Sequence, residues 1–325
     1  MKIYKYLITI IGVCSIIVVS FLLISSKLEV DTNKQQVEVL SFANPVSVPE
    51  SVDFCGKKIY LDRIDMRERF DREINAFTYL HSTTMLMIKR ANRYFPVIEP
   101  ILRKNNIPDD FKYLAVIESS LNPRALSSAK AAGMWQFIPE TGKKYGLEIN
   151  EQVDERYHIE KATEAACRYL NDAYLNYNDW AAAAASYNAG TARISSELSN
   201  QMVDNSFDLL LVEETSRYVF RILAAKEIFK NPYKYGFVLK KEDLYPVVRT
   251  QKVKVSTTIP DLAAFAKDYG INYFQLKEFN VWLRDRSLNI SDRNPKTYII
   301  DIPVVDDLYY SSNKIQVHDR NWIVE

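Results

Sequence analysis

Helical periodicity is the feature that most constrains how this chain can fold. Between residues 60 and 230, apolar residues recur at three- and four-residue spacing, and no hairpin signal interrupts them. We expect a long helix from about Leu61 to Tyr94, a short one over residues 97–104, and further helices over 160–177 and 213–229. The scarcity of glycine, 8 in 325 residues, agrees with a helical chain. This part is therefore predicted to be all-α.

The pattern changes after residue 245, where short β-type segments flank two short helical ones. We expect strands at 247–248 and 253–255, helices over 259–269 and 273–279, and a returning strand over 297–302. These elements predict a small βααβ module over residues 245–304. Residues 305–325 form a C-terminal tail, in which residues 314–317 favour one more strand. The fold class is mainly α: an all-helical domain followed by a small α+β module.

Composition excludes several classes of function. Lys plus Arg (42) and Asp plus Glu (41) nearly cancel, so the chain lacks the broad positive field of a nucleic-acid binder. The three histidines are scattered without ligand spacing, so we expect no metal, and without a glycine-rich phosphate loop we expect no cofactor. Cys55 and Cys167 leave two readings open: one disulfide, or Cys167 as a small core residue of a helix.

The N-terminal segment predicts export. Lys2 and Lys5 precede a stretch without charge over residues 6–24, and charged residues follow it. Residues 1–26 are either a cleaved signal peptide or a retained membrane anchor, and the basic residues place the rest of the chain outside the cytoplasm. Lipidation at Cys14 is not expected, because Val13 stands where a small residue is required. Residues 27–50 read as a linker.

Glu118 is the residue that points most directly to chemistry. Counting back by helical steps gives Ala115, Leu114 and Phe111, so the acid shares the apolar stripe of a short helix that starts near Pro108. Burial would raise the pKa of the carboxyl group and keep it protonated near neutrality, as a general acid requires. The alternative is a glutamate at the rim of the stripe whose head group reaches water.

Four motifs occur in order along the helical part. They are Val116–Ser127, Ala132–Gly142, Ser186–Gly190 and Glu214–Val219. Together they resemble the lysozyme-like lytic transglycosylases of bacterial cell walls, over about residues 52–230. The resemblance implies a lysozyme-like catalytic domain over residues 96–235, with a helical extension over residues 51–95 packed on it.

The resemblance also assigns roles to particular positions. Glu118 matches the family's single catalytic acid, and Ser127 matches a serine that orients the substrate's N-acetyl group. The other implied substrate-binding positions are Met134, Gln136, Tyr187, Asn188 and Tyr218. Met134 departs from the leucine that is usual there, and the Tyr218 hydroxyl is expected near the acid. The resemblance implies peptidoglycan glycan strands as the partner. Residues 1–26 separately predict a membrane as a partner and a location at the periplasmic face of the cell envelope, and protein partners stay unknown.

The core of the Glu118 motif offers one carboxylate, because no Asp or Glu follows Glu118 until Glu140, and the other sugar-contacting motifs contain only Glu214. Glycosidases that use water employ two carboxylates. A lone acid can instead protonate the glycosidic oxygen and then deprotonate the sugar's own 6-hydroxyl, which leaves a 1,6-anhydromuramoyl end. Two alternatives stay open: a hydrolase like goose-type lysozyme, or a glycan-binding protein without activity. The module over residues 245–304 resembles a divergent LysM repeat, or serves as a docking module without glycan affinity.

Overall fold

The computed structural model describes residues 45–324. The predicted signal or anchor (1–26), Cys14 and most of the predicted linker therefore lie outside the described residues. Residues Val46–Glu325 form one unit. Within residues 45–324, none of the helices combines the length and the apolar character needed to cross a membrane.

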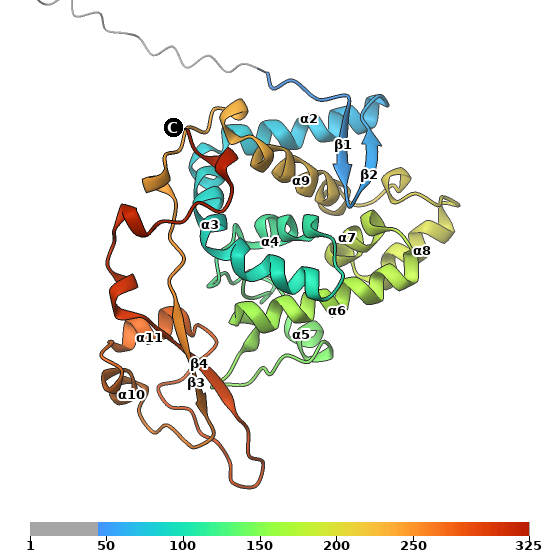
Figure 1. Ribbon diagram of the computed structural model, residues 1–325. Helices are drawn as coiled ribbons and strands as arrows, with labels where there is room; N and C mark the ends of the chain where they lie inside the picture. The colour runs from blue at the N-terminus through green and yellow to red at the C-terminus, as the bar shows by residue number, and fades with distance from the viewer. Residues whose placement is uncertain (1–44, 325) are drawn as a thin grey trace, which may run out of the picture. The chain divides into compact units, whose positions relative to one another are not determined.

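Eight helices form the N-terminal two thirds of the described chain (Figure 1). They are α2 (Ile64–Tyr79), α3 (His81–Lys104), α4 (Lys112–Ser119), α5 (Pro139–Lys144), α6 (Ile159–Tyr177), α7 (Trp180–Ala189), α8 (Thr191–Asn200) and α9 (Glu213–Lys230). Helix α9 packs along α2 and also contacts α4 and α7, while α6 lies between α3 and α7. Residues 61–249 are all described and contain no β-strand, which confirms the predicted all-α character there.

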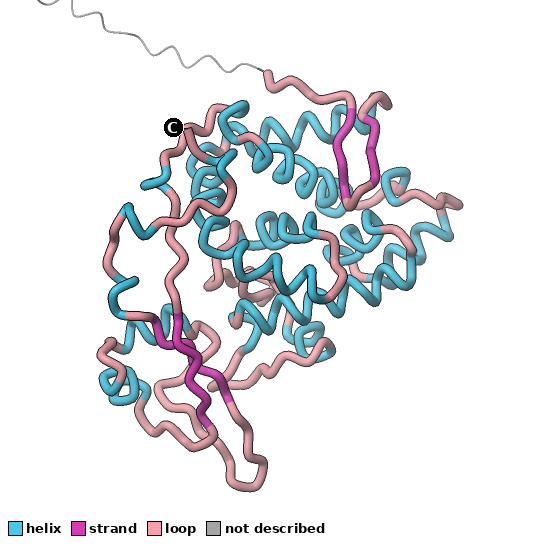
Figure 2. The backbone as a smooth tube through the Cα atoms, in the orientation of Figure 1, coloured by secondary structure: helices cyan, strands magenta, loops and turns pink. Residues whose placement is uncertain are grey.

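The predicted helical extension over residues 51–95 is wrong at its start. Strands β1 (Ser51–Phe54) and β2 (Lys57–Tyr60) form an antiparallel hairpin with Val52 opposite Ile59 (Figure 2). Cys55 and Gly56 make the turn with φ values of 52° and 77°, a conformation that suits a two-residue hairpin. The core receives Val52 and Phe54, the alternate residues of β1, and Ile59 of β2. This period-two pattern is too short to stand out in the sequence.

The predicted long helix from Leu61 to Tyr94 is also wrong, because it breaks at Leu80 (φ −81°, ψ 53°). The hydroxyl of Thr84 donates to the Phe77 carbonyl at 2.6 Å, so a side chain satisfies a backbone group at the break. Helix α3 then continues through Pro96 and Pro100, and the separate helix predicted at 97–104 is its last part. The fully buried side chains that α3 contributes to the core outweigh the missing N–H groups of the two prolines.

The C-terminal module has the predicted βααβ order. It consists of β3 (Thr250–Val255), α10 (Leu262–Asp268), α11 (Tyr273–Phe279) and β4 (Tyr298–Pro303), with Thr250 opposite Pro303 in an antiparallel pair. Residues 247–248 are not a strand, and neither are residues 314–317. The predicted tail instead returns to the main core, where the Trp322 indole N–H donates to the Phe229 carbonyl at 2.9 Å.

Both cysteines of the described chain are free thiols. Cys167 is fully buried on α6, which confirms the reading as a core residue, whereas Cys55 lies in the hairpin turn. The predicted alternative of a Cys55–Cys167 disulfide is wrong.

The module is joined to the helical part by a shared hydrophobic core. Ala132, Val153 and Tyr157 of the helical part belong to the same buried cluster as the module's apolar residues. The Asp154 N–H donates to the Trp282 carbonyl at 2.9 Å. The junction is therefore packed like a protein interior and not like a flexible linker.

Three rings stack across this junction. Trp282 lies between Tyr298 of β4, at 5.8 Å between ring centroids, and His158 of the helical part, at 5.6 Å. Burial lowers the pKa of His158 to about 3, and the charges of Lys161 and Lys252 act in the same direction. The histidine is thus neutral at physiological pH, so the ring stack buries no charged group and avoids the free-energy cost of doing so.

We predict that Trp282→Ala destabilises the whole described unit. Trp282 is 2% exposed, and truncating a buried tryptophan costs about 3–5 kcal/mol of unfolding free energy. Urea unfolding of the full chain should show this loss, whereas Tyr309→Ala, at a residue 70% exposed, should change stability by less than about 0.5 kcal/mol. A Trp282→Ala protein as stable as the Tyr309→Ala control would contradict the shared core.

Candidate active site

Glu118 lies in the last turn of α4, at the edge of its buried face. Phe111, Leu114 and Ala115 are fully buried, as the apolar stripe predicts. The helix ends just after the acid, where Ser120 and Leu121 both adopt left-handed backbone conformations (φ 55° and 54°). This turn leaves the Glu118 side chain partly accessible at the end of the helix.

The surroundings of Glu118 favour its protonated form. Burial raises the pKa of its carboxyl group from 4.5 to about 7, against the lowering effects of the Tyr218 hydrogen bond and of the Arg221 charge. The charge of Glu214 raises it slightly further. Near neutrality the group therefore exists in both protonation states, as a residue that must give and then take a proton requires.

Helix α9 supplies the groups that face Glu118. The Tyr218 hydroxyl, on a side chain only 2% exposed, donates a hydrogen bond to the Glu118 carboxylate. One turn later, Arg221 donates to the Ile117 carbonyl at 3.1 Å, which places its positive charge beside the acid. Because residues three apart share a helix face, packing α9 on α4 brings both groups to the same carboxyl.

Tyr187, near the end of α7, joins the acid to the next motif. Its hydroxyl donates to the Trp135 carbonyl at 2.9 Å, and its ring meets Tyr169 edge-on at 5.0 Å. Burial and the nearby Glu118 charge raise the pKa of Tyr187 well above its usual value. The neighbouring Asn188 accepts a hydrogen bond from the Thr215 hydroxyl at 2.8 Å, which ties α7 to the start of α9.

The segment around Trp135 is held by close backbone packing. Gly133 has a φ of 78°, and a Cβ there would lie 1.8 Å from the Arg156 carbonyl oxygen, so only glycine fits. The buried Trp135 donates its indole N–H to the Thr163 hydroxyl at 2.9 Å. Gln136 adopts a φ of 50° and donates its side-chain amide to the Gly133 carbonyl at 2.7 Å.

The predicted site residues thus fall into two groups. Glu118, Tyr187 and Tyr218 come together, and Asn188 joins them through Thr215. The other three make local contacts. The Ser127 hydroxyl accepts a hydrogen bond from the Ala131 N–H at 3.0 Å, and the Gln136 side-chain amide donates to the Gly133 carbonyl. Met134 lies in the core with 1% of its surface exposed. A direct substrate contact by any of these residues stays a prediction.

Sequence reasoning gave no role beside the acid to two charged residues. Arg221 and Glu214 both act on the pKa of Glu118, and they stand three residues after and four residues before Tyr218. That helical spacing was the available signal, because it puts them on the face that carries Tyr218.

We predict that Tyr218→Phe raises the pKa of Glu118 above the wild-type value of about 7. The hydrogen bond from Tyr218 stabilises the carboxylate, so its loss favours the protonated form. Carbon NMR titration of labelled glutamate carboxyls measures this change. Tyr177→Phe removes a hydroxyl that donates to the Thr191 carbonyl, and this control should leave the pKa unchanged. An unchanged or lowered pKa in Tyr218→Phe would contradict the assignment.

Two family models match the chain. Residues 95–208 match the "Transglycosylase SLT domain", and residues 251–306 match the "Soluble lytic transglycosylase C-terminal LysM-like domain". A curated relative, membrane-bound lytic murein transglycosylase D of Escherichia coli (strain K12), is 33% identical over 235 residues. These residues are 71% of this chain and 50% of the relative, so the chain spans about half the length of that protein.

Solved structures of similar proteins include two lytic transglycosylases. The 70 kDa soluble lytic transglycosylase of Escherichia coli has a TM-score of 0.39 and 18% identity, with 50% of this chain and 30% of that chain covered. An inactive mutant of lytic transglycosylase Slt from Pseudomonas aeruginosa has a TM-score of 0.37 and 19% identity, with 51% and 28% covered. The family matches show that the chain contains a transglycosylase SLT domain followed by a LysM-like domain of the soluble lytic transglycosylase type.

Proposed function

We propose that this protein is a peptidoglycan lytic transglycosylase in which Glu118 is the only catalytic acid and base. The observation that carries the proposal is the half-buried Glu118 carboxyl, with a pKa near 7 and a hydrogen bond from Tyr218, inside the SLT domain match. Curated relatives are named lytic murein transglycosylases, in agreement with this assignment.

The proposed reaction cleaves the β-1,4 bond between N-acetylmuramic acid and N-acetylglucosamine. Protonated Glu118 gives its proton to the glycosidic oxygen, and the bond from that oxygen to the muramoyl C1 breaks. The substrate's acetamido oxygen stabilises the positive charge at C1. The Glu118 carboxylate then takes the proton of the muramoyl 6-hydroxyl while the oxygen of that hydroxyl bonds to C1. This step restores the acid and closes the 1,6-anhydro ring. No water is consumed, because the attacking hydroxyl already belongs to the substrate.

One observation favours a second candidate, a hydrolase on the same fold. Glu214 is exposed on α9, and its charge acts on Glu118, so a second carboxylate lies in the neighbourhood of the acid. In hydrolases with two carboxylates, the second one activates water or attacks the sugar. The two reactions leave different ends on the glycan, and this difference separates the candidates.

We predict that the wild-type protein releases 1,6-anhydromuramoyl products from purified sacculi, detected by mass spectrometry. Glu118→Gln should slow their release by about a hundred- to ten-thousand-fold, because it removes the proton donor. Glu140→Gln, at an exposed glutamate in the first turn of α5, is the matched control and should keep full activity. Mainly reducing ends from the wild type, with a similar loss in Glu214→Gln, would support the hydrolase instead.

We predict that activity falls as the pH rises above about 7. The raised pKa of Glu118 means that the proton donor is present below this pH and is lost above it. In Tyr218→Phe the loss of activity should occur at higher pH, because this substitution raises the pKa of Glu118. Initial rates of anhydro-end formation between pH 5 and 9 measure this loss in both proteins. A wild-type activity that stays constant up to pH 9 would contradict the role of Glu118 as acid.

We further propose that the protein acts at the periplasmic face of the cell envelope, where its substrate lies. The uncharged stretch over residues 6–24, with Lys2 and Lys5 before it, supports export and membrane association. The curated relative is named as membrane-bound. Because the substrate is the glycan strand, binding of that strand by the LysM-like domain is part of this proposal.

A further inference from the structure

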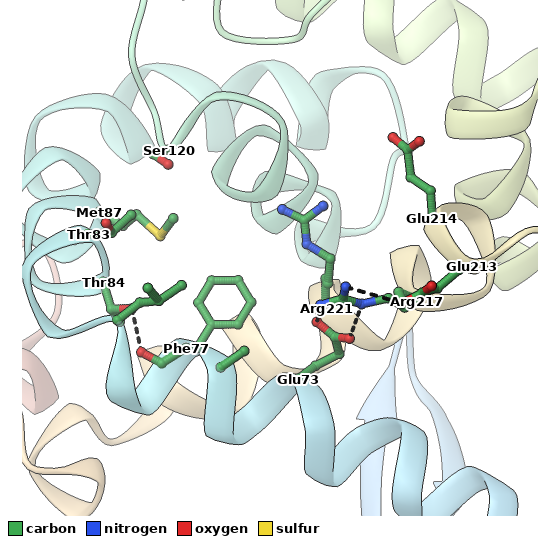
Figure 3. A pocket seen from close by; sticks show the side chains of 12 residues that line it. Glu73, Phe77, Thr83, Thr84, Met87, Ser120, Glu213, Glu214, Arg217 and Arg221 are labelled. Carbon is green, nitrogen blue, oxygen red and sulfur yellow. Dashed lines mark hydrogen bonds and ion pairs between the residues drawn. The ribbon is translucent and has the colours of Figure 1, made fainter.

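A cavity of about 600 Å³ opens next to the C-terminal end of α4, the helix that carries Glu118 (Figure 3). Its walls come from α2, α3, α9 and the end of α4. The lining residues are Glu73, Ala76, Phe77, Leu80, Thr83, Thr84, Met87, Ser120, Glu213, Glu214, Arg217 and Arg221. Ser120 stands two residues after Glu118, and the residues from α2 lie outside the part of the chain that matches the SLT domain.

The charges of this cavity are only partly paired. Arg217 donates to both carboxylate oxygens of the buried Glu73, at 2.6 and 3.2 Å, and also lies 3.8 Å from Glu213. Figure 3 shows Arg221 and Glu214 projecting from α9 away from this pair. Among the described residues, neither Arg221 nor Glu214 has an oppositely charged partner within 4.0 Å. The cavity therefore offers one guanidinium and one carboxylate to a ligand.

This chemistry does not suit a neutral sugar ring. Sugar rings pack on aromatic faces, and Phe77 is the single aromatic residue among those that line the cavity. A guanidinium and a carboxylate on one wall suit a ligand with ionised groups of both signs. Phe77 and Met87, which lie across the cavity from Glu214 in Figure 3, can receive aliphatic side chains, and Leu80 also lines the cavity.

We propose that the cavity binds the peptide stem of the muramoyl unit at the cleavage site, with a stem carboxylate on Arg221 and a stem amine on Glu214. This inference rests on the proposed function, because peptidoglycan stems are short peptides attached to muramic acid, the sugar whose bond Glu118 would break. A stem that leaves the sugar at Glu118 reaches the cavity past Ser120. The arginine uses one donor on the Ile117 carbonyl and keeps its other donors for a carboxylate.

The first experiment compares glycan strands that carry stems with the same strands after an amidase has removed them. The full-length wild type should form anhydro ends about tenfold more efficiently, as kcat/KM, on the strands with stems, the gain expected of one charge-assisted contact. Arg221→Gln should lose this preference and Arg221→Lys should keep part of it. Because the comparison is a ratio between two substrates, the effect of Arg221 on the pKa of Glu118 cancels. The matched control, Arg193→Gln at an exposed arginine of α8, should keep the full preference.

The second experiment measures binding of a synthetic stem peptide with a free carboxylate and a free amine by isothermal titration calorimetry. Arg221→Gln should weaken its binding about tenfold. Acetylation of the peptide's amine should weaken binding to the wild type but not to Glu214→Gln. Absence of peptide binding to the wild type, equal rates on both strand preparations, or an equal loss on both in Arg221→Gln would overturn the inference, even where anhydro ends form. Peptide binding without anhydro ends would overturn the proposed reaction alone.

Discussion

The site depends on a single carboxyl group held between burial and charge. Removing Glu118 from water opposes its ionisation, whereas the Tyr218 hydroxyl and the Arg221 guanidinium favour it, and the balance leaves its pKa at about 7. A more buried glutamate would keep its proton, and a more exposed one would lose it well below neutrality. The acid stands in the last turn of α4, where the left-handed residues Ser120 and Leu121 end the helix and open one side of the side chain.

Helix α9 is the element that maintains this balance. It carries Tyr218 and Arg221 toward the acid, holds Asn188 of α7 through Thr215, and pairs Arg217 with the buried Glu73 of α2. The bidentate Arg217–Glu73 pair satisfies a carboxylate that would be costly to bury alone. Since α2 precedes the SLT domain match, the N-terminal helices help to position the site and do not simply cover the core.

The C-terminal module is coupled to the candidate site through the segment over residues 154–158. The ring stack of Tyr298, Trp282 and His158 fixes the segment over residues 154–158, and the Arg156 carbonyl in that segment lies against Gly133. The Trp135 segment therefore rests on a backbone that the module supports. The module is therefore a structural support for the loop that carries Trp135.

Much of the site could be predicted from the sequence, and the failures have physical causes. Glu118 lies on the apolar stripe because helical spacing is a local property, and the βααβ order was read from local patterns in the same way. The hairpin at 51–60 was missed because its alternation spans four residues per strand. At the break near Leu80, the Thr84 hydroxyl donates to the Phe77 carbonyl, a contact that hydrophobic periodicity does not reveal. The return of Trp322 to the core and the cavity beside Arg221 depend on contacts between residues distant in the sequence.

The claim that one carboxyl group carries out the whole reaction without water is tested most directly by the oxygen at the new glycan end. The cleavage is run in water labelled with a heavy oxygen isotope, and the released muropeptides are weighed by mass spectrometry. The account predicts that no label enters the new ends, because the 6-hydroxyl of the substrate supplies the attacking oxygen. Labelled oxygen in the new muramoyl ends would contradict it.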